Sequence, residues 1–195
     1  MAIGTVVPRP IAWVTSLDSE GRLNLAPFSY FMACHSYLPA IAVSIGSRGG
    51  NPKDSRANIR RRGEFVVNLV TEELADRMNI TGAAFPTGVN EADVVGLATL
   101  PSTKVEPPRI AESPVHLECR VLHAIDLDED PLQSTLFVAQ VVMWHIRDDL
   151  VDDAYHVNQA ALHLVARMGG PYYARGWELF RMDIPDWRSV GPQPG

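Results

Sequence analysis

The sequence predicts a mainly β protein, built as an antiparallel barrel with a few helical insertions. Apolar runs rich in β-branched residues cover 11–17, 41–45 and 65–70, as expected of buried strands. Residues 115–125 alternate between apolar and polar side chains, and a second long run at 135–147 follows a polar turn. Helices are few, so the strands must supply most of the core.

Composition limits the classes of protein to consider. A chain of 195 residues fits one domain covering 1–195, and its charged fraction of 21% is ordinary for a globular protein. The net charge of −6 argues against nucleic acid as a partner. No apolar run reaches the length of a membrane span, and the first residues lack a secretory pattern. We therefore expect a cytoplasmic protein without a membrane partner. We also expect Cys34 and Cys119, which lie far apart among apolar residues, to be buried free thiols.

The first half of the predicted barrel contains a candidate pocket. The strand at 11–17 is followed by a turn at 18–21 and by a second extended run. That run offers the side chains of Asn24 and Ser29 for hydrogen bonding, and Pro27 leaves one backbone acceptor without a donor. Such a segment suits a flat polar ring better than pairing at both edges of a sheet.

Two helices are expected after the strand at 41–45. The first has Asn51 as N-cap, Pro52 at its first position and Gly63 at its stop, and the second runs from Thr71 to near Gly82. The first helix start is the best phosphate candidate, because free backbone N–H groups attract anions there. Three side chains could add to it: Arg48, Lys53 and Ser55. The same residues also fit an exposed helix start in solvent.

The second half of the chain is less regular. Residues 85–110 form a long loop with a short helix beginning at Asn90, and we consider this loop a lid. The turn of the long hairpin lies at 126–131. Gly169 and Gly170 precede Tyr172, an aromatic residue that could cover a ring. A last strand is expected at 177–182, before an irregular tail at 186–195.

No set of residues indicates catalysis by the protein's own side chains. The six histidines form no metal-binding spacing, and Ser29 lacks the Gly-x-Ser-x-Gly turn of a serine hydrolase. Periodicity does not decide which face of its strand His145 occupies. We therefore expect neither a metal site nor a catalytic side chain.

Five short sequence motifs, here called words, occur in an order that resembles the flavin reductase-like family of FMN-binding split-barrel proteins. These words are Pro8-Arg9-Pro10-Ile11-Ala12, Asn24-Leu25-Ala26-Pro27-Phe28-Ser29-Tyr30-Phe31, Lys53-Asp54-Ser55 with Asn58-Ile59, Gly63-Glu64-Phe65-Val66-Val67-Asn68, and Ala166-Arg167-Met168-Gly169-Gly170. The resemblance implies a six-stranded Greek-key split barrel, a homodimer with FMN at its interface, and hydride transfer from NADH or NADPH to flavin N5.

The resemblance also implies roles for particular residues. The flavin ring would lie along 24–30, with Ser29, Tyr30 and the backbone near Ala26 and Pro27 at its polar edge. Lys53 and Ser55, with Arg48, would bind the phosphate, and Tyr172 would approach the ring from a partner subunit or a crossing loop. The ribityl chain would contact three residues of the next strand: Ser44, Ile45 and Gly46.

Three functions remain open at this point. Reduced flavin could leave for a partner flavin-dependent oxygenase; the protein could instead transfer electrons from FMN or store it without turning over nicotinamide; or it could be a structural dimer without flavin. Many family members carry a helical leader before the first word, whereas this chain begins seven residues before Pro8. Either the start is truncated or the leader is dispensable, and its absence could weaken the dimer contacts and the closure over the cofactor.

Overall fold

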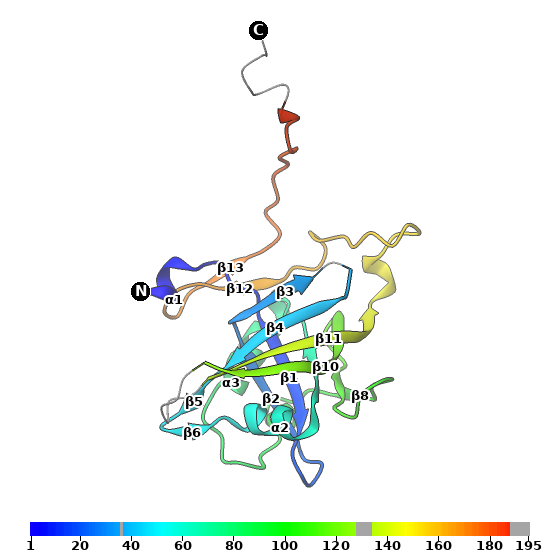
Figure 1. Cartoon of the computed structure of the whole chain (residues 1–195). Coiled ribbons are helices and arrows are strands. Elements are labelled where there is room, and N and C mark those ends of the chain that lie inside the picture. The colour runs from blue at the N-terminus through cyan, green and yellow to red at the C-terminus, as the bar shows by residue number, and fades with distance from the viewer. Residues whose placement is uncertain (36, 128–133, 188–195) are drawn as a thin grey trace.

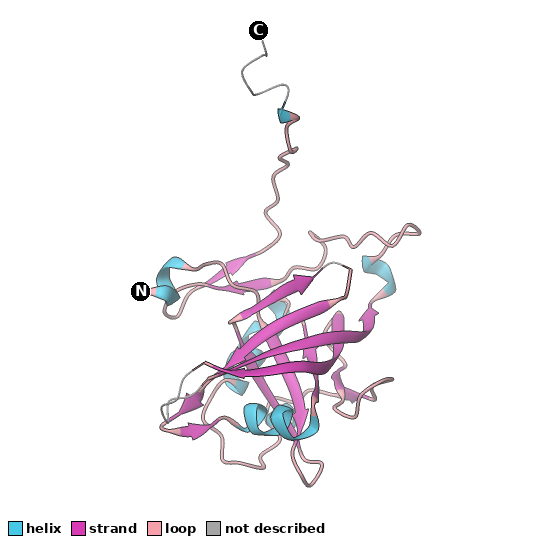
Figure 2. Cartoon of the chain, viewed as in Figure 1, coloured by secondary structure: helices cyan, strands magenta, loops and turns pink. Residues whose placement is uncertain are grey.

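One antiparallel sheet of seven strands forms the body of the protein. In the computed structural model, which describes residues 1–35, 37–127 and 134–187, its strand order is β2-β1-β7-β10-β11-β4-β3. The sheet curls into a split barrel, and small ladders and helices surround it (Figures 1 and 2). The fold class expected from the sequence is confirmed.

The main-sheet strands are β1 (Ala12–Leu17), β2 (Leu23–Phe28), β3 (Phe31–His35), β4 (Ala40–Ile45), β7 (Glu64–Asn68), β10 (Val115–Asp126) and β11 (Thr135–Ile146). Three two-stranded ladders pair β5 (Ser47–Arg48) with β6 (Asn51–Pro52), β8 (Thr99–Leu100) with β9 (Arg109–Ile110), and β12 (Val165–Arg167) with β13 (Tyr173–Arg175). The helices are α1 (Ala2–Thr5), α2 (Asp54–Arg62), α3 (Ala75–Thr81) and α4 (Glu91–Val94), with 3-10 turns η1 (Glu72–Leu74) and η2 (Asp148–Leu150).

The extended run after Gly21 is divided in two. Ser29 and Tyr30 separate β2, which pairs with β1, from β3, which pairs with β4. The main sheet therefore has seven strands where the family resemblance implied six. This division places Pro27 to Tyr30 at a bend between two strands, which leaves their backbone and side chains available to a pocket.

The barrel interior is filled by alternate residues of every main strand. Val14, Val43, Val67, Phe137 and Cys119 are among its fully buried members. Residues paired across an antiparallel ladder project to the same face, so the remaining residues of these strands point to the outer face. The long hairpin of β10 and β11 supplies the largest ladder, as its sequence pattern predicted.

A second apolar cluster covers the outer face of β1, β2 and β7. Trp13 and Leu25 come from the sheet, Met78 from α3, and Ile110 from β9, and all are buried. The outer face of β3, β4, β11 and the distal half of β10 has no such cluster among the described residues. The sheet therefore has a covered half and an uncovered half.

The helix at 51–63 begins later than predicted. Lys53 is the N-cap and Asp54 the first helical residue, while Asn51 and Pro52 form β6 against β5. The backbone pairing of Ser47 with Pro52 overrides the capping pattern, because the segment turns back on itself before the helix. Gly63 ends the helix in the left-handed region at φ 73°, as predicted, where residues with a Cβ are strained.

The other helical expectations hold. Thr71 precedes η1 and α3, which ends at Gly82, and the Asn90 side chain accepts a hydrogen bond from Ala92 N at the start of α4. The loop that we expected at 85–110 also contains the β8–β9 ladder, which its irregular sequence did not reveal.

Two expectations are wrong. Residues 177–182 form no strand, because no described strand pairs with them; β12 and β13 form the last ladder instead. Cys34 is exposed on β3, whereas Cys119 is buried as expected. The predicted turn at 126–131 and the tail beyond 187 lie largely outside the described residues.

Candidate functional site

Two adjacent cavities meet at the bend after β2. The first has a volume of about 180 Å³ and lies between β2, the start of α2 and the segment after α3. The second has a volume of about 260 Å³ and lies between the bend, Arg9, α3 and the β12–β13 ladder. Pro27 and Phe28 line both cavities, so one ligand could extend from one to the other.

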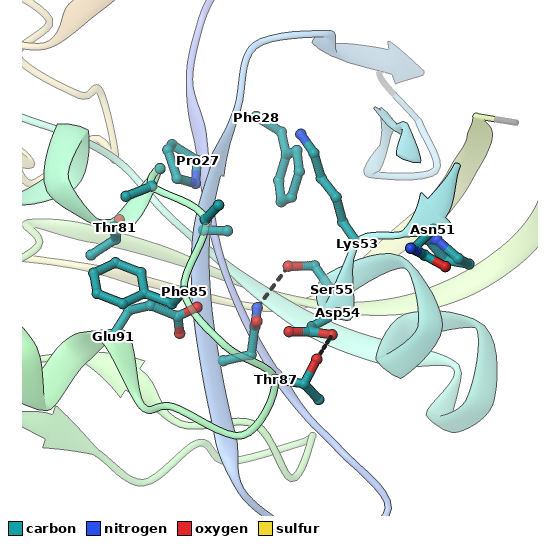
Figure 3. Close-up of a pocket in the computed structure, with 16 residues that line it drawn as sticks. Pro27, Phe28, Asn51, Lys53, Asp54, Ser55, Thr81, Phe85, Thr87 and Glu91 are labelled. Carbon is teal, nitrogen blue, oxygen red and sulfur yellow. Dashed lines mark hydrogen bonds between the residues drawn. The ribbon is translucent and has the colours of Figure 1, made fainter. Parts of the chain in front are cut away.

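The start of α2 opens into the first cavity (Figure 3). Arg56 N and Ala57 N donate to Lys53 O at 2.9 and 3.2 Å, so the helical hydrogen bonds begin there. The amides of Asp54 and Ser55 precede this bond and have no helical acceptor. Together with the positive end of the helix dipole they form a candidate anion site.

Two side chains strengthen this anion site. The Lys53 ammonium lies 5.3 Å from the centroid of the Phe28 ring, within range of a cation–π contact. Ser55 is 1% exposed, and its hydroxyl oxygen accepts a hydrogen bond of 2.7 Å from Asn24 Nδ2. Because Asn24 supplies the donor, the Ser55 proton can be donated to an anion in the cavity.

The carboxylates near the cavity are engaged by other groups. Thr87 Oγ1 donates to Asp54 Oδ1 at 3.1 Å, which draws that carboxylate toward the loop after α3 (Figure 3). Glu91 Oε2 accepts from Leu25 N at 2.8 Å and so satisfies an amide on the free edge of β2. Burial raises the pKa of Glu91, with Asp54 adding to the rise against the hydrogen bonds that lower it. This shift reduces its repulsion of an anion.

Arg9 organises the second cavity. Arg9 is 6% exposed, and its guanidinium donates to Ser29 Oγ at 3.3 Å and to the carbonyls of Val6 and Met168 at 2.8 and 3.1 Å. It also lies 5.7 Å from the centroid of the Tyr30 ring. Arg9 therefore fixes Ser29 and ties the N-terminal segment to the β12–β13 turn.

Arg167 and Tyr173 form the opposite wall of the second cavity. The Arg167 guanidinium lies 4.6 Å from the centroid of the Tyr173 ring and hydrogen-bonds its hydroxyl. Tyr173 in turn donates to Asn79 Oδ1 at 3.2 Å. The wall combines an aromatic face with positive charge, which suits a planar or anionic ligand.

The structure brings together seven of the predicted site residues. These residues line one or both cavities: Asn24, Ala26, Pro27, Ser29, Tyr30, Lys53 and Ser55. Ser44, Ile45 and Gly46 lie on neighbouring β4 and just beyond it, and Ser44 N donates to Tyr30 O at 2.8 Å. They line neither cavity.

Arg48 and Tyr172 stand apart from these seven. The Arg48 side chain is not among the described side chains, although its backbone is in β5. Tyr172 is 71% exposed and lines neither cavity, whereas the next residue, Tyr173, does. A contact from Tyr172 to a ligand stays a prediction.

Sequence reasoning missed several lining residues. Arg9 belongs to the first sequence word, but nothing in that word shows that its guanidinium bridges distant segments. Thr81 and Phe85 line the first cavity because the chain after α3 folds back over β2. Glu91 directly follows the capping residue Asn90, and that position is the one signal that could have drawn attention to it.

The residues present fit a flavin mononucleotide. The helix start with Lys53 and Ser55 supplies backbone donors, a hydroxyl and a positive charge for a phosphate. The bend at 27–30 supplies an aromatic side chain, a proline and exposed backbone for a flat ring. Within the described residues, no three His, Cys, Asp or Glu side chains are grouped to hold a metal, and no helix could cross a membrane.

Known proteins share this sequence pattern and fold. Residues 3–164 match the model of the flavin reductase like domain. A protein of Deinococcus radiodurans without a described function is 40% identical over 95% of this chain and 85% of its own length.

Two solved structures are similar over almost the whole chain. Nitrilotriacetate monooxygenase component B from Bacillus cereus is 32% identical, with a TM-score of 0.88 over 92% of this chain and 90% of that one. The 2-nitrobenzoate 2-nitroreductase of Pseudomonas fluorescens is 34% identical, with a TM-score of 0.86 over 99% and 91%.

These findings define a split-barrel protein of the flavin reductase-like class. The chain belongs to the flavin reductase-like family, as its five sequence words indicated.

Proposed function

We propose that the protein binds FMN and transfers hydride from NADH or NADPH to it. The observation that carries this proposal is the start of α2, which opens beside Asn24 into a cavity joined to the aromatic bend of β2. Family membership supports flavin binding, and the similarity to a monooxygenase component supports release of reduced flavin to an oxygenase partner.

The protein's own residues bind and orient in this proposal. Lys53, Ser55 and the amides of α2 hold the phosphate, and Asn24 fixes the Ser55 hydroxyl for that purpose. Arg9 fixes Ser29 at the polar edge of the ring. When bound, flavin itself supplies the hydride-accepting chemistry, so no acid–base pair from the chain is needed.

A homodimer belongs to the same proposal. Tyr30 is 52% exposed beside the second cavity, and Tyr172 is 71% exposed at the nearby β12–β13 turn. A second subunit would cover the open side of the ring, with Ser44, Ile45 and Gly46 near the ribityl chain and Arg48 near the phosphate. The segment after α3, whose Phe85 and Thr87 line the first cavity, would act as the lid.

Oxidation of NADH and NADPH, followed at 340 nm with FMN, FAD or riboflavin, tests this function. We expect nicotinamide oxidation that depends on flavin, with FMN preferred over riboflavin because only FMN carries the phosphate. Tight FMN binding without nicotinamide oxidation would instead identify an electron-transfer or flavin-storage protein. Absence of flavin binding would leave only a structural role.

A second candidate is direct reduction of a nitroaromatic acid on the bound flavin. The 34% identity with a 2-nitrobenzoate nitroreductase favours it, as do Arg167 and Tyr173 in the second cavity. Adding 2-nitrobenzoate to the same assay tests it. Stimulated nicotinamide oxidation under anaerobic conditions, with loss of the nitroarene, would support this reaction, and an unchanged rate would exclude it.

A further inference from the structure

Residues 177–187, here named the C-terminal arm, leave the body of the protein. Gly176 N still donates to Leu164 O at 2.9 Å, and the Trp177 ring stacks on His163 with centroids 4.8 Å apart. Beyond this contact the chain extends away from the barrel (Figure 1). These contacts hold the first residues of the arm to the body of the described chain.

The arm is apolar although it is exposed. Five large side chains face solvent, with exposures from 60% to 96%: Leu179, Phe180, Met182, Ile184 and Trp187. Phe180, Met182 and Ile184 alternate with Arg181 and Asp183, which pair with each other at 2.9 Å. An alternation with period two is typical of a strand with one apolar face. The strand predicted from the sequence at 177–182 overlaps this segment, but the described chain offers it no partner strand.

The uncovered half of the sheet is the complementary surface. Met32 on β3, Ala42 on β4, Val138 on β11 and His123 on β10 form one cross-strand row on its outer face. Met32 is 59% exposed, and Ile125 in the next row is 48% exposed. Ala42 is buried between its neighbours in this row, whereas Met32 and Ile125 are left exposed by the described chain.

The free edge of this half is β3. It pairs with β4 alone and ends the strand order, so one row of its backbone groups has no neighbour in the main sheet. Four of its five residues are exposed, which is unusual for a strand in a barrel wall. An exposed edge strand is the site at which another extended segment adds.

We propose that the C-terminal arm of one chain adds as a strand to the free edge of β3 in a second copy of the same chain. Phe180, Met182 and Ile184 then extend the uncovered apolar face beside Met32. The exposed arm and the free edge of β3 belong to the same sequence, so a two-fold axis lets the arm of each copy pair with the β3 edge of the other. This exchange is independent of flavin binding.

Cys34 on β3 provides a built-in reporter, since its thiol is exposed and the other cysteine, Cys119, is buried. Cysteine is introduced singly at each of 179–184 in the full chain, and oxidised glutathione accepts the two electrons and two protons released as each disulfide forms. We expect covalent dimers on non-reducing gels, strongest at alternate positions. Mass spectrometry should find the Cys34 peptide joined to the arm peptide.

The same series in a Cys34→Ser background is the matched control, and dimers should vanish there. Dimers that persist in it would show arm-to-arm contact and overturn the proposal. A bridge to Cys34 within one chain, giving an oxidised monomer, would overturn it too, because the arm would then fold onto its own β3.

A second measurement does not depend on oxidation. Replacing Phe180, Met182 and Ile184 together by Ser should raise the dimer dissociation constant at least tenfold by light scattering. Val94→Ser on α4, where Val94 is 53% exposed, is the control and should leave the constant unchanged. An unchanged constant in the triple variant would contradict arm exchange.

Discussion

The two halves of the barrel wall differ in what covers their outer faces. On the covered half, Trp13 and its neighbours lie beneath α3, α4 and the β8–β9 ladder, which together are called the cover. Trp13 Nε1 donates to Thr81 Oγ1 at 2.9 Å. On the uncovered half, apolar residues such as Met32 and Ile125 face solvent. The two halves belong to one continuous sheet, so the difference arises from the chain segments that pack on β1, β2 and β7 and not on β3, β4 and β11.

This difference separates stability from assembly. The covered half is held by contacts within one chain, and the candidate flavin site lies at its margin, where the cover and the start of α2 meet β2. The uncovered half offers a large surface that the described chain does not use. We therefore expect substitutions to act on folding in the first half and on association in the second.

The largest expected effect is that of Trp13→Ala. Trp13 is fully buried, so its removal should lower the free energy of unfolding by about 3–5 kcal/mol, as measured by urea denaturation. Trp144→Ala is the matched control, since Trp144 is 48% exposed and its loss should cost less than about 1 kcal/mol. An equal loss of unfolding free energy in the two variants would contradict the distinction between the covered and the exposed parts of the sheet.

His116, at the boundary of the cover, should make stability depend on pH. Burial lowers its pKa from 6.5 to about 4, opposed by the hydrogen bond between its Nε2 and Ile110 O at 2.7 Å. The unfolded chain therefore binds an extra proton between these pH values, and stability should fall as the pH drops from 6.5 toward 4, by up to about 3 kcal/mol.

His116→Gln should reduce this loss, as followed by denaturation at several pH values. His123→Gln, at an exposed imidazole on β10, is the control and should leave the pH profile unchanged. A His116→Gln profile as steep as that of the wild type would mean that other groups cause the acid sensitivity.

A smaller effect is expected at the cap of α4, part of the cover. Asn90→Ala removes the side-chain acceptor for Ala92 N and should cost about 1 kcal/mol. Asn90→Asp keeps an acceptor and should restore most of the loss. If both variants were equally unstable in thermal denaturation, loss of the cap would not explain the lower stability of Asn90→Ala.

The sequence predicted those elements whose signals are local. Alternation defined the β10–β11 hairpin, and Gly63, Thr71 and Asn90 marked helix ends that the structure confirms. The start of α2 was misplaced because the β5–β6 pairing is a contact between segments that no capping pattern contains.

The candidate site was predictable to a similar extent. Lys53 and Ser55 follow from the chemistry of a helix start, and the bend at 27–30 follows from its proline. Arg9 and Tyr173 could not be found in this way, because they reach the second cavity only through contacts between the N-terminal segment and the β12–β13 ladder.

The most direct test of the account compares the affinities of FMN and riboflavin for the wild type and for the Lys53→Ala/Ser55→Ala variant, by flavin fluorescence quenching. FMN should bind the variant at least tenfold more weakly, about 1.4 kcal/mol, while riboflavin binding stays the same because it has no phosphate. Lys104→Ala, at an exposed lysine, is the control. Unchanged FMN affinity in a folded double variant would contradict the placement of the phosphate at the start of α2.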